Sequence, residues 1–106
     1  MAEGMAERQH VLREEYHRQT ARIHWHELQT YYAHGSVIVV SPALSLVDVA
    51  VQLGMDNTDS FQCWIATGEV AGVSDEQALA WYEANTLLWA VVAAPWVLVQ
   101  ERNGEL

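Results

Sequence analysis

The chain has 106 residues, and its 14 carboxylates against five basic side chains, all of them arginine, give a formal net charge of −9. This balance argues against a nucleic-acid-binding protein, because affinity for phosphates rests on Lys and Arg. Hydrophobic residues make up 51% of the chain, which excludes a disordered acidic tail and predicts one small folded domain.

The negative charge is unevenly distributed along the chain. Residues 1–26 carry four arginines and four glutamates, whereas residues 27–106 carry ten carboxylates and Arg102 as their only basic residue. We therefore expect three parts: a partly mobile helical arm over residues 1–20, a folded domain over residues 21–101 and a loose tail over residues 102–106.

No segment of the sequence is typical of a membrane protein. The longest apolar run, Leu87–Val99, has 13 residues and contains Pro95, whereas a membrane-spanning helix needs about 20 residues. The N-terminal region is polar and lacks the apolar stretch of a secretory signal. Cys63 has no second cysteine with which to form an internal disulfide. We expect a cytoplasmic protein with no membrane partner.

The first predicted element is a long N-terminal helix from Ala6 to about Ala33. No Pro or Gly interrupts this stretch, and apolar side chains recur at steps of three and four residues. The apolar stripe becomes dense only after residue 22, so the C-terminal half of the helix is expected to pack on the domain. His34-Gly35 supplies the helix end.

The middle of the chain predicts one strand and two helices. Residues 36–41 form an apolar run rich in β-branched side chains, which favours a buried strand. Ser45 is placed to cap a helix over residues 46–53, and a second helix is expected over residues 57–68. Residues 69–73 are a weaker candidate for an extended segment.

The last third of the chain predicts a helix followed by two strands. Ser74 has the position of an N-cap for a helix over residues 75–85. The strands are expected over residues 88–93 and 96–100, separated by Pro95, which cannot donate to a strand ladder. The expected fold is α+β: a mainly antiparallel sheet of about three strands, packed by about four helices that include the long N-terminal one.

Three segments carry a family resemblance: Ile23–Leu28 (IHWHEL), Val37–Leu53 (VIVVSPALSLVDVAVQL) and Leu88–Glu101 (LWAVVAAPWVLVQE). They resemble small bacterial proteins grouped as the domain of unknown function family 2288, over roughly residues 20–101. The resemblance implies a bacterial, cytoplasmic protein. These segments define a fold, and the resemblance assigns no catalytic or binding residue.

A candidate metal site lies on the predicted N-terminal helix. His10, His17 and His24 follow one another at seven-residue steps, so they share one face of a helix. Glu14 and His17 form the Glu-x-x-His unit of carboxylate-bridged metal bundles. One chain holds a single unit, and a dimer would supply the second. The hypothesis is a divalent metal bound by His10, Glu14 and His17; solvated side chains on a polar helix are the simpler interpretation.

Four aromatic residues form a second candidate set: Trp25, Tyr31, Tyr32 and Trp96. Aromatic side chains are enriched at protein interfaces, which makes these four a candidate interaction surface. Aromatic side chains also fill the core of small domains, and a core role is the favoured interpretation for these four residues.

The remaining residues give no catalytic signature. Cys63 is expected to be a buried core thiol and no nucleophile, because the sequence places no histidine or helix N-terminus beside it. The sequence also lacks a Gly-x-Ser-x-Gly elbow and a phosphate-binding glycine loop. We therefore predict a protein-interaction or self-association module that is not an enzyme and has no cofactor. We expect it to form a homodimer or to bind another protein. The contact would be made by the helical arm and by an open sheet edge. A metal-binding protein is the alternative.

Overall fold

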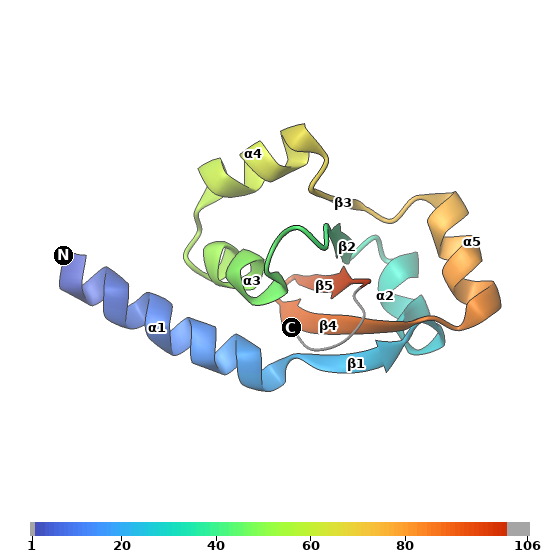
Figure 1. The fold of residues 1–106 in the computed structure, drawn as a ribbon, viewed down its shortest axis with the longest axis horizontal. Coiled ribbons are helices and arrows are strands. Elements are labelled where there is room, and N and C mark those ends of the chain that lie inside the picture. The colour runs from blue at the N-terminus through green and yellow to red at the C-terminus, as the bar shows by residue number, and fades with distance from the viewer. Residues whose placement is uncertain (1, 102–106) are drawn as a thin grey trace.

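A five-stranded mixed sheet forms the centre of the computed structural model, which describes residues 2–101 (Figure 1). The strands, in chain order, are β1 (Ala21–His24), β2 (Val37–Val40), β3 (Val70–Gly72), β4 (Leu87–Ala93) and β5 (Trp96–Gln100). The helices are α1 (Ala2–Gln19), the 3-10 helix η1 (Trp25–Leu28), α2 (Gln29–Ala33), α3 (Leu46–Gly54), α4 (Thr58–Thr67) and α5 (Asp75–Ala84).

The sheet has the strand order β1-β4-β5-β2-β3. Strands β1 and β4, β4 and β5, and β2 and β3 pair antiparallel, whereas β2 and β5 pair parallel with Val37 opposite Val97. The turn between β4 and β5 contains a cis peptide bond between Ala94 and Pro95. The predicted α+β class and mainly antiparallel sheet are confirmed, and the expected break at Pro95 is a hairpin turn.

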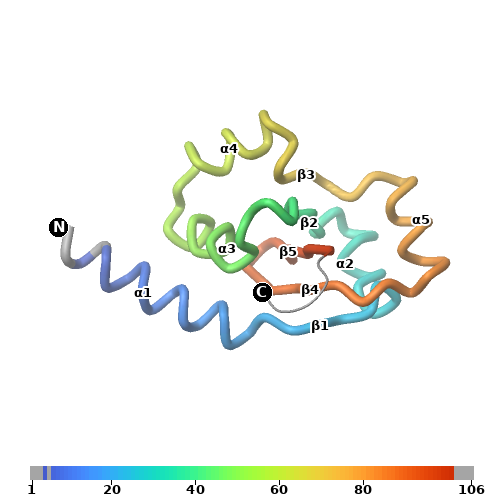
Figure 2. The backbone as a smooth tube through the Cα atoms, in the orientation of Figure 1, coloured from blue at the N-terminus to red at the C-terminus, as the bar shows by residue number. Residues whose placement is uncertain are grey.

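Both faces of the sheet are buried, and successive residues of the central strands alternate between two apolar clusters. In β5, Val97 and Val99 belong to the first cluster and Leu98 belongs to the second. The first cluster is covered by η1, α2 and α5, and the second by α1, α3 and α4 (Figure 2). Continuous apolar runs are typical of strands that are buried on both faces.

The predicted single helix over residues 6–33 is wrong. Helix α1 ends at Gln19, where the hydroxyl and the amide of Thr20 both donate to the carbonyl oxygen of Tyr16 at 2.6 and 2.9 Å. The next four residues pair with β4 as strand β1. Pairing with the exposed edge of β4 overrides the helical propensity of this segment, which sequence periodicity alone does not reveal.

Two further differences from the predicted fold follow from this break. Within residues 2–101 the structure has five strands and five α-helices, where about three strands and four helices were expected. The segment predicted as one helix contains strand β1 and two separate α-helices, α1 and α2, as well as the 3-10 helix η1. The weakly predicted extended segment is strand β3. The expected loose tail over residues 102–106 lies outside the described residues.

The predicted helix caps are confirmed. The Ser45 hydroxyl accepts from the Asp48 amide at 3.3 Å, and the Ser74 hydroxyl accepts from the Gln77 amide at 3.1 Å. Helix α4 ends at Gly68, whose φ of 79° is the left-handed conformation that favours glycine. Local side-chain chemistry therefore fixes where α3, α4 and α5 begin and where α4 ends.

Helix α1 extends away from the sheet, but it packs on α3 where the two helices meet (Figure 1). Arg13 forms an ion pair with Asp48, and the Arg8 guanidinium donates to the carbonyl oxygen of Gly54 at 3.2 Å. A Cβ atom at Gly54 would lie 2.8 Å from the Tyr16 hydroxyl oxygen and 3.3 Å from Cδ1 of Leu12. Glycine at this position allows the two helices their close approach.

We predict that Gly54→Ala destabilises the protein by about 1 to 2 kcal/mol. Overpacking against Tyr16 costs about 1–3 kcal/mol and outweighs the roughly 0.5–1 kcal/mol by which alanine favours a helix. Urea denaturation followed by circular dichroism measures the change. Gly4→Ala is the matched control, because a Cβ at Gly4 meets no atom within 4 Å, and it is expected to be neutral or slightly stabilising. Equal effects of the two substitutions would contradict the contact between α1 and α3.

Candidate functional site

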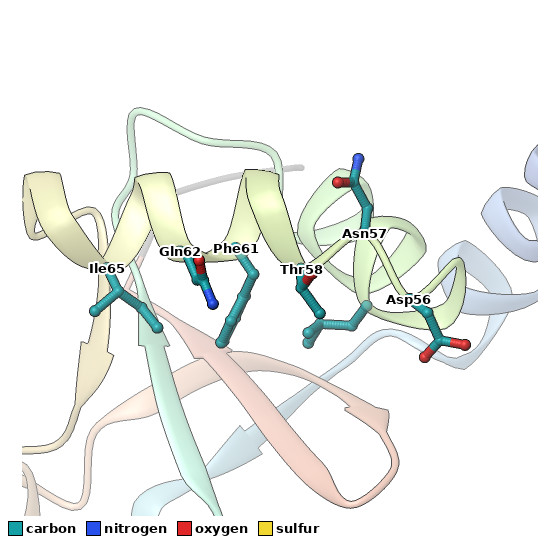
Figure 3. Close-up of a pocket in the computed structure, with 7 residues that line it drawn as sticks. Asp56, Asn57, Thr58, Phe61, Gln62 and Ile65 are labelled. Carbon is teal, nitrogen blue, oxygen red and sulfur yellow. The ribbon is translucent and has the colours of Figure 1, made fainter.

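A shallow groove of about 280 Å³ lies between α4 and the C-terminal end of α3 (Figure 3). We call it the α3–α4 groove. It is lined by Leu53, Asp56, Asn57, Thr58, Phe61, Gln62 and Ile65. The groove has an apolar floor with polar residues at its margins, which is the composition of a site that receives apolar side chains.

Helix α4 contributes most of this lining from one side. Thr58, Phe61, Gln62 and Ile65 follow one another at steps of three and four residues, so they lie on one face of the helix. Figure 3 shows Thr58, Phe61 and Ile65 projecting from the same side of α4. The helix begins at the Asn57 cap, whose side-chain oxygen accepts from the Ser60 amide at 3.3 Å.

Helix α4 contains large apolar residues, and none of its residues is fully buried. Phe61 and Trp64 are half-buried against the second apolar cluster, and Ile65 is 51% exposed. The helix therefore covers the edge of that cluster with one side and leaves an apolar strip open beside it.

The turn between α3 and α4 places a carboxylate at the end of the groove. Asp56 has a φ of 57°, in the left-handed region, and its amide donates to the carbonyl oxygen of Leu53 at 3.1 Å. The next amide, that of Asn57, donates to the carbonyl oxygen of Gln52 at 2.9 Å. These bonds end α3 tightly and turn the chain directly into α4, which brings Leu53 and Phe61 to the same hollow.

The surroundings of the groove are acidic. Residues 46–67, which form α3, the turn and α4, contain three aspartates and no Lys, Arg or His. Asp48 is paired with Arg13 of α1. Asp56 and Asp59 form no ion pair with any described residue; Asp56 lines the groove, and Asp59 lies in the first turn of α4, next in sequence to the lining residue Thr58. A cationic ligand is attracted by such a margin, and an anionic one is repelled.

A second hollow, of about 510 Å³, adjoins the groove. It is lined by Gln9 of α1, Gln52, Met55 and Asn57. The Asn57 side-chain amide donates to the Gln52 side-chain oxygen at 2.7 Å, and Figure 3 shows Asn57 pointing away from Phe61 and Ile65. The two hollows therefore meet at Asn57, with polar carboxamides on one side and apolar side chains on the other.

The structure brings two of the three predicted metal-binding residues, His10 and Glu14, into contact. His10 and Glu14 are 3.2 Å apart on α1, and both side chains are exposed. His17 lies one turn further along α1, and His24 is on strand β1, so the predicted common face with His24 is wrong. Among the described residues, no group of three or more His, Cys, Asp or Glu side chains is arranged to hold a metal ion.

The four aromatic residues proposed as an interaction surface are separated by the sheet. Trp25 is 0% exposed, with its ring centroid 5.1 Å from that of Trp81 and 5.4 Å from that of Tyr32. Trp96 packs against the second cluster instead. A core role is therefore observed for Trp25, as the favoured interpretation expected. Tyr31 is exposed and borders a small apolar cup of about 110 Å³ on the first face.

The prediction that Cys63 is buried is wrong, because its side chain is exposed on α4. The neighbouring residues Phe61 and Trp64 turn toward the second cluster, and the helical period then directs Cys63 toward solvent. Leu53 and Ile65 were not among the site residues predicted from the sequence. The four-residue step from Phe61 to Ile65 was a visible signal, but spacing does not show whether another element covers the face.

The edge strands of the sheet offer little room for a further strand. At the end of β1, the outward amide of His24 donates to the Glu27 carboxylate at 3.3 Å, and the amide of the next residue, Trp25 of η1, donates inward to the carbonyl oxygen of Thr86 at 2.8 Å. The opposite edge, β3, has three residues and includes Gly72. Short and internally capped edges oppose strand addition, so the sheet edge is a poorer candidate surface than the groove.

Within residues 2–101, no helix has both the length and the apolar composition needed to cross a membrane.

Comparisons with known proteins identify relatives without assigning a role. The family model described as "Protein of unknown function (DUF2288)" matches residues 11–101. The fold is similar to the NMR solution structure of PA1075 from Pseudomonas aeruginosa, with a TM-score of 0.77 and 38% sequence identity over 89% of this chain and 87% of that chain. No curated protein matches the chain. The family resemblance read from the sequence is confirmed, and the match extends into α1.

Tyr32 is held by a carboxylate on α5: its hydroxyl donates to Asp75 at 3.0 Å. This hydrogen bond, with smaller effects of desolvation and of the Asp75 charge, raises the pKa of Tyr32 above its usual value of about 10. The folded protein therefore favours the neutral phenol of Tyr32. The neutral phenol adds to the free energy of unfolding fully below pH about 10, and this contribution is lost as the pH rises through the higher pKa of Tyr32 in the folded protein.

We predict that Asp75→Asn lowers the pKa of Tyr32 toward its usual value. The substitution removes the negative charge and weakens the acceptor that favours the phenol. NMR titration of proteins labelled with ¹³C at the tyrosine ring Cζ measures the pKa directly. Asp56→Asn, which removes the same charge at the groove, is the control and is expected to leave the pKa of Tyr32 unchanged. An unchanged pKa in Asp75→Asn would contradict this assignment.

Proposed function

This chain belongs to the family of proteins of unknown function DUF2288, and we propose that it is a protein-interaction module that binds an apolar segment of a partner protein in the α3–α4 groove. The observation that carries the proposal is the incomplete burial of α4. The helix presents Phe61 and Ile65 at a four-residue step beside Leu53, in a hollow that is open to solvent. Side chains of a partner would complete the cover that the chain itself does not provide.

The chemistry of the groove supports binding over catalysis. Its floor is formed by Leu53, Phe61 and Ile65, and Asp56 is the ionisable residue of its lining. The other polar residues of the lining, Asn57, Thr58 and Gln62, carry amide and hydroxyl groups, which suit hydrogen bonding to a ligand. A cytoplasmic location is part of the proposal, supported by an exposed Cys63 thiol that forms no disulfide.

Direct binding of model helices tests the proposal. We suggest three fluorescein-labelled helical peptides of about 14 residues, with one shared leucine face and with Lys, Gln or Glu on the polar face. Fluorescence anisotropy is expected to show saturable binding of at least one peptide. Ile65→Asp is expected to weaken that binding by about tenfold, or roughly 1.4 kcal/mol, because it replaces an apolar contact with a charge.

The matched control is Leu79→Asp. Leu79 is 59% exposed on α5, a helix that covers the other face of the sheet. The two substitutions change the net charge equally, so a general electrostatic effect would alter both proteins alike. Affinity of Leu79→Asp is expected to stay within about twofold of the unchanged protein. Failure of all three peptides to bind, or equal losses in the two variants, would overturn the proposed function.

A second candidate function is divalent-metal binding by α1. It rests on the His10–Glu14 pair, whose nitrogen and oxygen atoms are 3.2 Å apart. Two copies of α1 in a dimer would bring two His10–Glu14 pairs and two His17 side chains, enough donors for a carboxylate-bridged site. The expected result for this candidate is stoichiometric Zn²⁺ or Mn²⁺ bound to a dimer of untagged protein.

Metal titration by isothermal calorimetry, combined with sedimentation analysis, tests this candidate. The variant His17→Ala is expected to reduce metal affinity by about tenfold or more, whereas His34→Ala, in the turn after α2, is the control. A monomer that gives no heat of metal binding, or equal effects of the two alanine variants, would exclude the candidate.

A further inference from the structure

We infer that the partner segment recognised by the α3–α4 groove is a basic amphipathic helix. The inference rests on the proposed function and adds the chemical class of the partner. Three features of the described residues support it: the charge around the groove, the way the chain holds its own α1 helix, and the arrangement of the apolar positions on α4.

The first feature is the charge balance around the groove. Asp56 and Asp59 lie at the turn into α4, and residues 46–67 contain no basic side chain. Among residues 2–101, each arginine is already engaged elsewhere. Arg8 donates to Gly54, Arg13 pairs with Asp48, Arg18 pairs with Glu15, and Arg22 lies over the Trp89 ring at 4.8 Å. A partner that balances the two aspartates must therefore supply its own Lys or Arg.

The second feature is the contact between α1 and α3. On its α3 side, α1 brings apolar Leu12 and Tyr16 together with Arg8 and Arg13. Arginine here pairs with an aspartate of the acidic surface while the apolar side chains pack beside it. Helix α3 thus already binds one helix, α1, through a combination of apolar packing and arginine contacts. The α3–α4 groove offers the same combination on the neighbouring side of α3, with its apolar floor and Asp56 unoccupied by any described residue.

The third feature is the geometry of the groove. Its lining extends along α4 from Thr58 to Ile65, which corresponds to about 10 Å at 1.5 Å per residue. This length matches about two turns of a partner helix, which presents apolar anchors at positions i, i+3, i+4 and i+7. The edge strands β1 and β3 are only four and three residues long, which disfavours an extended partner strand. A helix with apolar residues on one face and basic residues beside them fits both the shape and the charge of the groove.

The three peptides described above distinguish this inference from the proposed function. At low salt, the Lys peptide is expected to bind at least about tenfold more tightly than the Gln peptide, and the Glu peptide most weakly. The preference for Lys over Gln is expected to diminish at about 1 M salt, where exposed charges are screened. The double variant Asp56→Asn/Asp59→Asn is expected to reduce that preference at least about threefold, with the affinity for the Gln peptide unchanged.

The matched control is Glu76→Gln/Glu83→Gln on α5, which removes the same charge from exposed positions on the helix that covers the other sheet face. It is expected to leave the Lys-over-Gln preference nearly unchanged. Equal binding of the Lys and Gln peptides, both still sensitive to Ile65→Asp, would overturn the basic partner and leave the proposed function standing. An equal loss of preference in the two double variants would also overturn it. Groove-dependent dimerisation of the protein alone would identify a second copy as the occupant and overturn it as well.

Discussion

The whole structure depends on covering both faces of a small sheet with one short chain. Val97, Leu98 and Val99 of the central strand β5 are all buried, so helices must pack on each side. Burial of apolar surface contributes about 25 cal/mol per Å², but a chain of this size forms few helices that can cover the sheet. The first face is covered around Trp25 and Trp81, and only the small cup beside Tyr31 is open on it among the described residues. The second face is closed by α3 and α1, and α4 reaches only its margin.

This unequal cover explains why the groove lies where it does. The contact of α1 with α3 is close because Gly54 has no side chain, and the ion pair of Arg13 with Asp48 holds the two helices at that point. Helix α4 begins only four residues after the end of α3, so this short turn places it beside α3 and at the margin of the sheet. Its apolar residues are therefore shared between the core and the solvent. Asp56, which makes the turn in the left-handed conformation, places negative charge at the end of the groove.

Much of the fold was predictable because local chemistry specifies it. The caps Ser45, Asn57 and Ser74 act within three residues of themselves, so a sequence shows them directly. Strand β1 was not predictable in this way. Its residues have helical periodicity, and their extended conformation depends on β4, which is more than sixty residues away. The same limit applies to the site: the spacing of Phe61 and Ile65 is local, but the absence of a covering element is a property of the whole fold. Cys63 was predicted to be buried for the same reason, since its neighbours in space were unknown.

If the acidic, partly covered α4 binds a basic helix, NMR can locate the binding surface most directly. Amide resonances of ¹⁵N-labelled protein would be followed during titration with the lysine-faced peptide. We expect saturable shifts concentrated on α4 and the end of α3, at Leu53, Asp56, Phe61 and Ile65, with small changes on α5. Shifts concentrated on α5 or strand β1, or spread evenly over all acidic residues of the chain, would contradict it.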